Sequence, residues 1–171
     1  MSRPHENSGN DTEEVVVVLP FDASSRVLLQ LRDAIPGIAF PGHWGFFGGA
    51  MCVGETPEEA AFRETQEELG FEPPAVIFLG EEAIVDLRGL VAYAFAFPLA
   101  TPMPDLVQRE GMDMMFVSLR QVLSGTIVSP KHKTPFPVAP TAFLPRTIER
   151  LAENVRANRL PDPSVGNRHR R

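Results

Sequence analysis

Short apolar runs with β-strand character alternate along this chain with stretches of helical periodicity. Residues 14–19 form a continuous β-branched run, which is typical of a strand buried on both faces. Residues 26–32 predict a second strand, and the two can form a hairpin. Residues 75–79 and 90–97 predict further strands, and residues 110–117 predict a turn leading into the last one. In the 90–97 strand the alanines at 92, 94 and 96 share one face, where a helix can pack closely.

Two longer segments carry helical signals. A helix is predicted over residues 57–69, because Thr56 and Glu59 complete a capping box and Gly70 supplies the left-handed position that ends it. A second helix is predicted within residues 141–158, where apolar residues recur at 4-3-4 spacing. Ser118 can cap a short helix through Leu123. Residues 129–140 contain four prolines and predict a long irregular loop.

This order of elements predicts an α/β fold of the α+β type, with a mixed sheet between helices. A chain of 171 residues without an internal repeat fits a single domain. We place that domain at residues 13–160, with a disordered arm over 1–12 and a flexible tail over 161–171.

Composition narrows the possible partners. The net charge of −6 argues against a nucleic-acid polymer, because proteins that bind one usually carry a basic surface. No apolar run approaches the length that spans a bilayer, and residues 1–12 lack the apolar core of a secretory signal. The single cysteine, Cys52, excludes an intrachain disulfide, and the four histidines show no zinc-binding spacing. We expect a cytoplasmic protein that does not contact a membrane.

The predicted helix at 57–69 carries more negative charge than its stability favours. Glu64, Glu67 and Glu68 share one face at i, i+3 and i+4, near the end of the helix where the dipole disfavours anions. One interpretation is a solvated acidic face, in which Arg63 relieves part of the repulsion. However, a glycine-rich loop precedes the helix, and three carboxylates beside exposed backbone form an oxygen-rich site for a hard cation such as Mg²⁺.

The same stretch resembles the Nudix box, G-x5-E-x7-R-E-U-x-E-E-x-G-U, where U is an apolar residue. The positions in register are Gly49, Glu55, Arg63, Glu64, Glu67, Glu68, Gly70 and Phe71. Thr65 departs from the pattern, since the family usually has Leu, Ile or Val there. Phe47 departs from a second feature, because it stands where the family commonly has a proline before the glycines.

The resemblance implies the Nudix fold, an α-β-α sandwich, and a Nudix pyrophosphohydrolase activity. Such an enzyme hydrolyses a nucleoside diphosphate linked to another moiety, with Mg²⁺ as cofactor and Mn²⁺ as a possible substitute. It implies metal ligation by Glu64, Glu67 and Glu68 with the backbone carbonyl of Gly48. Glu55 and Arg63 would then support the ligands without touching the substrate.

The general base is left open at this stage. It is either Glu64 or a neighbouring carboxylate of the box, or a carboxylate outside the box. Glu110 is the first choice outside the box because it precedes a predicted strand, and Glu81 and Glu82 come next. A nucleotide-binding regulatory module without catalysis is the alternative function. Degenerate members of the family usually lose carboxylates of the box, and all are present here.

The box does not specify the substrate. Gln30 and Arg32 share one face of the predicted strand at 26–32 and are candidate substrate-binding residues, or they face solvent. Trp44 either stacks on a base or anchors the glycine loop in the core. Lys131 and Lys133 either meet a phosphate or lie in a solvated loop. We expect a small nucleotide substrate, with a nucleotide sugar slightly favoured over a (d)NTP, and a homodimer is possible.

Overall fold

A computed structural model of the chain describes residues 13–84, 89–99, 106–157 and 159–160. Its elements, in order, are β1 (Glu13–Phe21), β2 (Val27–Leu31), β3 (Trp44–Gly45), α1 (Pro57–Leu69), β4 (Ile77–Ile84), β5 (Leu90–Pro98), β6 (Asp113–Val117), α2 (Leu119–Leu123), β7 (Thr126–Val128), β8 (Pro135–Pro137) and α3 (Phe143–Arg156). The predicted arm and tail lie outside the described residues. None of the helices in these ranges is long and apolar enough to cross a membrane.

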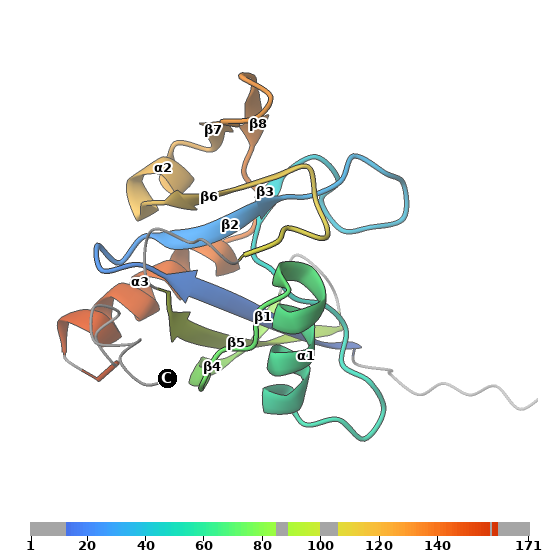
Figure 1. The fold of residues 1–171 in the computed structure, drawn as a ribbon, viewed down its shortest axis with the longest axis vertical. Helices are drawn as coiled ribbons and strands as arrows, with labels where there is room; N and C mark the ends of the chain where they lie inside the picture. Colours follow the sequence, from blue (N-terminus) through green and yellow to red (C-terminus); the bar gives the residue numbers. More distant parts are fainter. Residues whose placement is uncertain (1–12, 85–88, 100–105, 158, 161–171) are drawn as a thin grey trace, which may run out of the picture.

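One mixed sheet of six strands forms the centre of the fold (Figure 1). Its order is β3-β2-β1-β5-β4, and β6 pairs with β2. β1 and β5 are parallel over their whole length, from Glu13 opposite Leu90 to Phe21 opposite Pro98, whereas the other pairs are antiparallel. α1 covers one face and α3 the other. The predicted fold class, a mixed sheet between helices, is confirmed.

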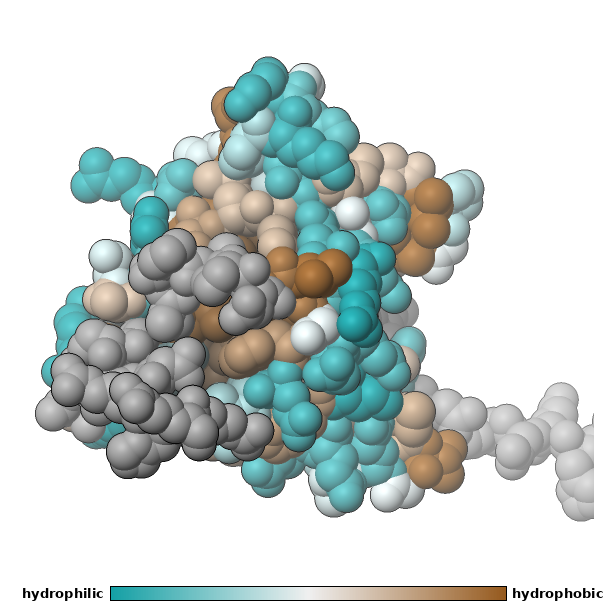
Figure 2. All heavy atoms as spheres, viewed as in Figure 1, coloured by the Kyte–Doolittle hydropathy of each residue, from teal (hydrophilic) through white to brown (hydrophobic). Residues whose placement is uncertain are grey.

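The two faces of the sheet bury different side chains. On the α3 face, the alanines of β5 pack in one cluster with Leu144, Ile148 and Leu151, as their alternation predicted. On the α1 face, Ala61, Thr65 and Leu69 are fully buried. Thr65 donates its hydroxyl to the Ala61 carbonyl at 2.7 Å, so the polar atom at this unusual position has a partner. On the face seen in Figure 2, hydrophilic residues cover much of the surface around α1.

The predicted hairpin of β1 and β2 forms, although the two strands pair only where Phe21 meets Val27, and residues 47–51 run beside the rest of β1. Two other predictions need correction. β4 continues to Ile84 instead of ending at Leu79, because a bulge between Phe78 and Gly80 bends the strand while its pairing with β5 continues. The proline-rich stretch, expected as an irregular loop, contains β8, which forms a small hairpin with β7 just before the stretch.

Candidate active site

The glycine segment, residues 45–49, lies between β1 and the carboxylates of α1. The Val18 and Val16 amides donate to the carbonyls of Phe47 and Gly49 at 3.0 and 2.9 Å, which fixes the segment alongside β1. Gly48 has a φ of +125°, and a Cβ added to it would lie 2.1 Å from the Val16 carbonyl oxygen. A Cβ on Gly49 would lie 2.7 Å from Oε1 of Glu64. Position 48 therefore requires glycine for its backbone conformation and close approach, whereas a side chain at position 49 would displace the Glu64 carboxylate.

Glu68 is a buried carboxylate held by neutral donors. Only 4% of its surface is exposed. Gln30 Nε2 donates to Oε1 at 2.9 Å, and the Gly48 amide donates to Oε2 at 2.6 Å. The pKa of Glu68 is raised to about 7, chiefly by burial. The two hydrogen bonds act to lower this pKa, whereas the negative charges of Glu64 and Glu110 raise it further. A buried anion without a cationic partner fits a bound metal ion.

The other two box carboxylates both contact Arg63. Glu64 is also buried, and its Oε1 accepts from Arg63 at 2.5 Å. Burial raises the pKa of Glu64 in spite of this contact. Glu67 is different, because 57% of its side chain is exposed and its 3.2 Å contact with Arg63 lies at the surface. The glutamates predicted as one ligand set therefore divide into two buried groups and one exposed group.

Arg63 connects α1 to the loop that precedes it by hydrogen bonds. Its Nε and Nη2 donate to the two carboxylate oxygens of Glu55 at 2.8 and 2.9 Å, and Nη2 also donates to the Ala50 carbonyl at 3.0 Å. The hydrogen bond from Arg63, together with the Cys52 amide, lowers the pKa of Glu55 to about 2. Glu55 and Arg63 thus connect the glycine loop to the helix, and a bidentate pair of this kind has a fixed geometry.

Glu110 is brought to the same region by backbone hydrogen bonds. The amides of Val107 and Arg109 donate to the carbonyls of Leu69 and Glu68 at the end of α1, at 3.1 and 2.9 Å. The Glu110 side chain is exposed, and its charge contributes to the raised pKa values of Glu64 and Glu68. Glu110 therefore lies close enough to the buried pair to influence both.

The two runner-up carboxylates lie elsewhere. Glu82 forms ion pairs with Arg146 and Arg150 of α3. Glu81 is paired with Tyr93 across β4 and β5. Both belong to the edge of the sheet remote from β2, so among the outside candidates the structure places only Glu110 beside the box.

The candidate substrate residues lie in three different environments. Gln30 is 3% exposed and contacts Glu68 and the Phe46 carbonyl, so it faces the carboxylates and not open solvent. Trp44 is fully buried and its indole donates to the Ile127 carbonyl at 3.1 Å. This burial fits the anchoring interpretation and leaves no ring face for a base. Arg32 lines a pocket, with Nε donating to the Ala39 carbonyl at 2.7 Å.

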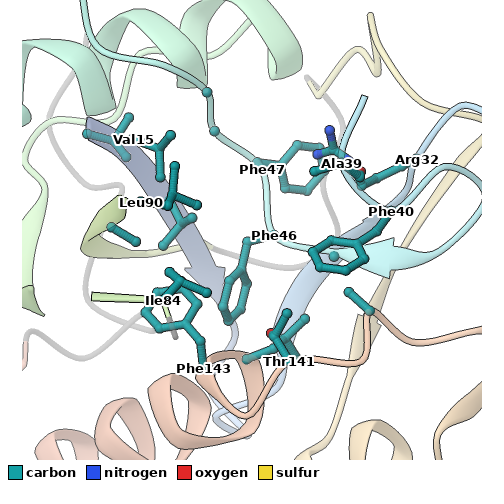
Figure 3. A pocket seen from close by; sticks show the side chains of 18 residues that line it. Val15, Arg32, Ala39, Phe40, Phe46, Phe47, Ile84, Leu90, Thr141 and Phe143 are labelled. Atoms are coloured by element: carbon teal, nitrogen blue, oxygen red, sulfur yellow. Dashed lines mark hydrogen bonds between the residues drawn. The ribbon is translucent and has the colours of Figure 1, made fainter. Parts of the chain in front are cut away.

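The pocket beside Arg32 was not predicted from the sequence. It has a volume of about 180 Å³ and lies between the sheet and the start of α3 (Figure 3). Phe46 and Phe143 meet edge to face inside it, with ring centroids 6.0 Å apart, and Phe40 lines the side near Arg32. Gly48 and Gly49 also line it, so the same segment borders both the pocket and the carboxylates.

The donor set suits a hard divalent cation, although its members are not gathered around one point. Among the described residues, no three histidine, cysteine or acidic side chains already form a metal-binding group. Glu64 and Glu68 are buried beside the glycine segment, whereas Glu67 is exposed and contacts Arg63 at the surface. Carboxylate and carbonyl oxygens are the ligands that Mg²⁺ prefers.

Solved structures of other proteins share this fold. The fold resembles MutT protein from Methanosarcina mazei Go1, with a TM-score of 0.61 at 20% identity over 84% of this chain and 94% of that one. It also resembles the NUDIX domain of Shewanella oneidensis NrtR, solved with ADP ribose, with a TM-score of 0.61 at 17% identity, over 89% and 94% of the two chains. These likenesses concern the fold alone.

Sequence comparison identifies the family. The model of the NUDIX domain matches residues 11–135, and the chain belongs to this family of hydrolases. Its members act on pyrophosphate bonds of nucleoside diphosphate derivatives and generally use divalent metal ions. A curated relative, nucleoside triphosphatase NudI from Enterobacter sp. (strain 638), is 43% identical over 54 residues. That match spans 32% of this chain and only 38% of the relative.

Proposed function

We propose that the protein hydrolyses the pyrophosphate bond of a nucleoside diphosphate derivative and depends on Mg²⁺, for which Mn²⁺ can substitute. The observation that carries the proposal is the buried carboxylate of Glu68, which has only neutral donors, next to Glu64 and the glycine segment. Glu64, Glu67, Glu68 and the Gly48 carbonyl would hold the metal. A bound divalent cation neutralises pyrophosphate charge and lowers the pKa of a coordinated water.

The residues of the chain supply the rest of the chemistry. In the reaction a water oxygen forms a bond to one phosphorus of the pyrophosphate, the bond between that phosphorus and the bridging oxygen breaks, and the leaving group keeps the bridging oxygen. The water proton needs an acceptor, and we assign that role to Glu110, because its exposed carboxylate lies next to the buried pair. Arg63 holds the loop and helix together through Glu55 and does not contact substrate.

The apolar pocket supports a nucleobase as the group bound away from the phosphates. Phe40, Phe46 and Phe143 provide aromatic surface, and Arg32 and Thr141 are the polar side chains in the lining. A cavity of similar size lined by apolar residues binds a single aromatic ring. Sugar hydroxyls would find few partners there, so we place the base in this pocket, and both a nucleoside triphosphate and a nucleotide sugar carry such a base. The name of the NudI relative leads us to propose a nucleoside triphosphate in place of the nucleotide sugar that the sequence slightly favoured.

A substrate panel tests the proposal. Nucleoside triphosphates, ADP-ribose and UDP-glucose would be incubated with Mg²⁺ and wild-type protein, or with Glu67→Gln, Glu68→Gln or Glu110→Gln. Each substitution should lower kcat by about 10²- to 10⁴-fold, the usual contribution of a catalytic carboxylate. Glu58→Gln, an exposed glutamate in the first turn of α1, is the matched control and should retain wild-type activity.

Two outcomes would contradict the proposal. Turnover that is insensitive to Glu67→Gln and Glu68→Gln would exclude this site as the catalytic centre. Binding of a nucleotide without turnover of any member of the panel would instead favour the regulatory module that the sequence left as an alternative.

A further inference from the structure

Gln30 is a buried polar residue where three separate segments meet. Its Nε2 donates to Oε1 of Glu68 at 2.9 Å and to the Phe46 carbonyl at 3.2 Å. Because both partners accept, the orientation of the amide group follows from the contacts. At its other end, a Cβ added to Gly111 would lie 3.0 Å from Oε1 of Gln30. The side chain is thus hydrogen-bonded to Phe46 and to Glu68 of α1, and its Oε1 lies near Gly111, the residue after Glu110.

The chemical type of this residue is as informative as its position. Glu64 and Glu67 are contacted by a guanidinium, that of Arg63. Glu68 accepts from Gln30 and from the Gly48 amide, and both donors are neutral. A neutral donor fixes the direction of a carboxylate and favours its anionic form without cancelling its charge. A lysine at position 30 would also donate to Glu68. Its positive charge, however, would compensate the charge of the carboxylate and so disfavour a metal ion beside it.

We propose that Gln30 is a positioning residue that orients Glu68 for metal binding while leaving its negative charge uncompensated. The inference rests on the metal-binding role of Glu68 in the proposed function. It also assigns Gln30 to the metal side of the site, whereas the sequence suggested contact with substrate. Side chains that orient metal ligands through hydrogen bonds typically change metal affinity by about 10- to 100-fold when replaced.

The first test replaces the donor by an apolar side chain of similar length. Mn²⁺ binding to substrate-free wild type and Gln30→Met would be measured by electron paramagnetic resonance. Gln30→Met should bind Mn²⁺ about 10- to 100-fold more weakly and should lose kcat with little change in KM for the nucleotide. Leu28→Met is the matched control, since Leu28 is buried on the same strand and face and contacts apolar neighbours. Equal Mn²⁺ affinity in Gln30→Met and wild type would overturn the inference.

The second test separates orientation from charge. Gln30→Lys retains a donor for the Phe46 carbonyl and for Glu68, so it avoids the unpaired carbonyl that Gln30→Met leaves behind. It should fold, as judged by circular dichroism, and yet bind Mn²⁺ at least as weakly as Gln30→Met does. A Gln30→Lys protein with wild-type Mn²⁺ affinity would contradict the need for a neutral donor.

The two proposals fail in different ways. Mn²⁺ binding that depends on Gln30, in a protein that turns over no nucleotide, would support this inference and overturn the proposed function. Metal-dependent turnover, combined with Mn²⁺ binding that is unchanged by both substitutions, would support the proposed function and overturn this inference.

Discussion

Metal-free protein should become less stable as the pH rises from 5 to 8, because Glu68 is buried without a cation. Its pKa is raised from 4.5 to about 7 in the folded state. Between those values the folded protein keeps a proton that the unfolded chain has released, so the free energy of unfolding falls as pH rises. The difference between pH 5 and pH 8 for this one group is about 2–3 kcal/mol. Burial raises the pKa of Glu64 as well, which adds to the same slope.

Urea unfolding in EDTA at constant ionic strength, at each pH unit from 5 to 8, measures this slope. Glu68→Gln should flatten most of it, whereas Glu58→Gln should follow wild type. Mg²⁺ added at pH 8 should raise the stability of wild type more than that of Glu68→Gln, because a ligand stabilises the state it binds. A free energy of unfolding that is constant or rises over this range in wild type would refute the reasoning about Glu68.

Three further predictions follow from the same contacts. Gly48→Ala should destabilise the protein by about 3 kcal/mol, because the added Cβ meets the Val16 carbonyl at a φ of +125°. Chemical denaturation measures this loss, and Gly54→Ala, which also has a positive φ but no atom within 4 Å of the added Cβ, should lose less. Trp44→Phe should cost about 1–3 kcal/mol by the same assay, since the Ile127 carbonyl loses its indole donor. Phe143→Leu should raise KM for a nucleoside triphosphate with little change in kcat, and an unchanged KM would exclude this pocket as the base site.

Local signals in the sequence predicted the helix of the box well. Thr56 and Glu59 form the capping box in the structure, and Gly70 ends the helix with a φ of 62°. These features depend on residues three or four positions apart, so no tertiary information is needed. The alanine face of β5 was predictable for a similar reason, because alternation along one strand reports which face a helix can approach.

The environment of each carboxylate could not be predicted from spacing. Glu64, Glu67 and Glu68 share a helix face, but only two of them are buried, because the glycine segment contacts Glu68 and lies beside Glu64. The contact between Gln30 and Glu68 joins residues 38 positions apart. Periodicity on β2 indicated a polar face without indicating which segment would cover it.

Long-range packing also explains the other differences. Trp44 lies in a sequence that suits either a stacking platform or a core anchor, and its contact with Ile127, 83 residues away, selects the anchor. The pocket near Phe46 is formed by the sheet, α3 and the loop containing Phe40, which no local pattern brings together. The hairpin β7–β8 was missed because Pro135 and Pro137 disfavour strands in general but are tolerated in a short two-stranded ribbon.

Product analysis by ³¹P nuclear magnetic resonance tests the central claim most directly. Wild-type protein would be incubated with a nucleoside triphosphate and Mg²⁺, with Glu68→Gln and an EDTA-treated sample in parallel. Wild type alone should release a nucleoside monophosphate and pyrophosphate, because the bond inside the nucleoside diphosphate unit is cleaved. Release of nucleoside diphosphate and orthophosphate, or equal product formation by Glu68→Gln, would contradict it.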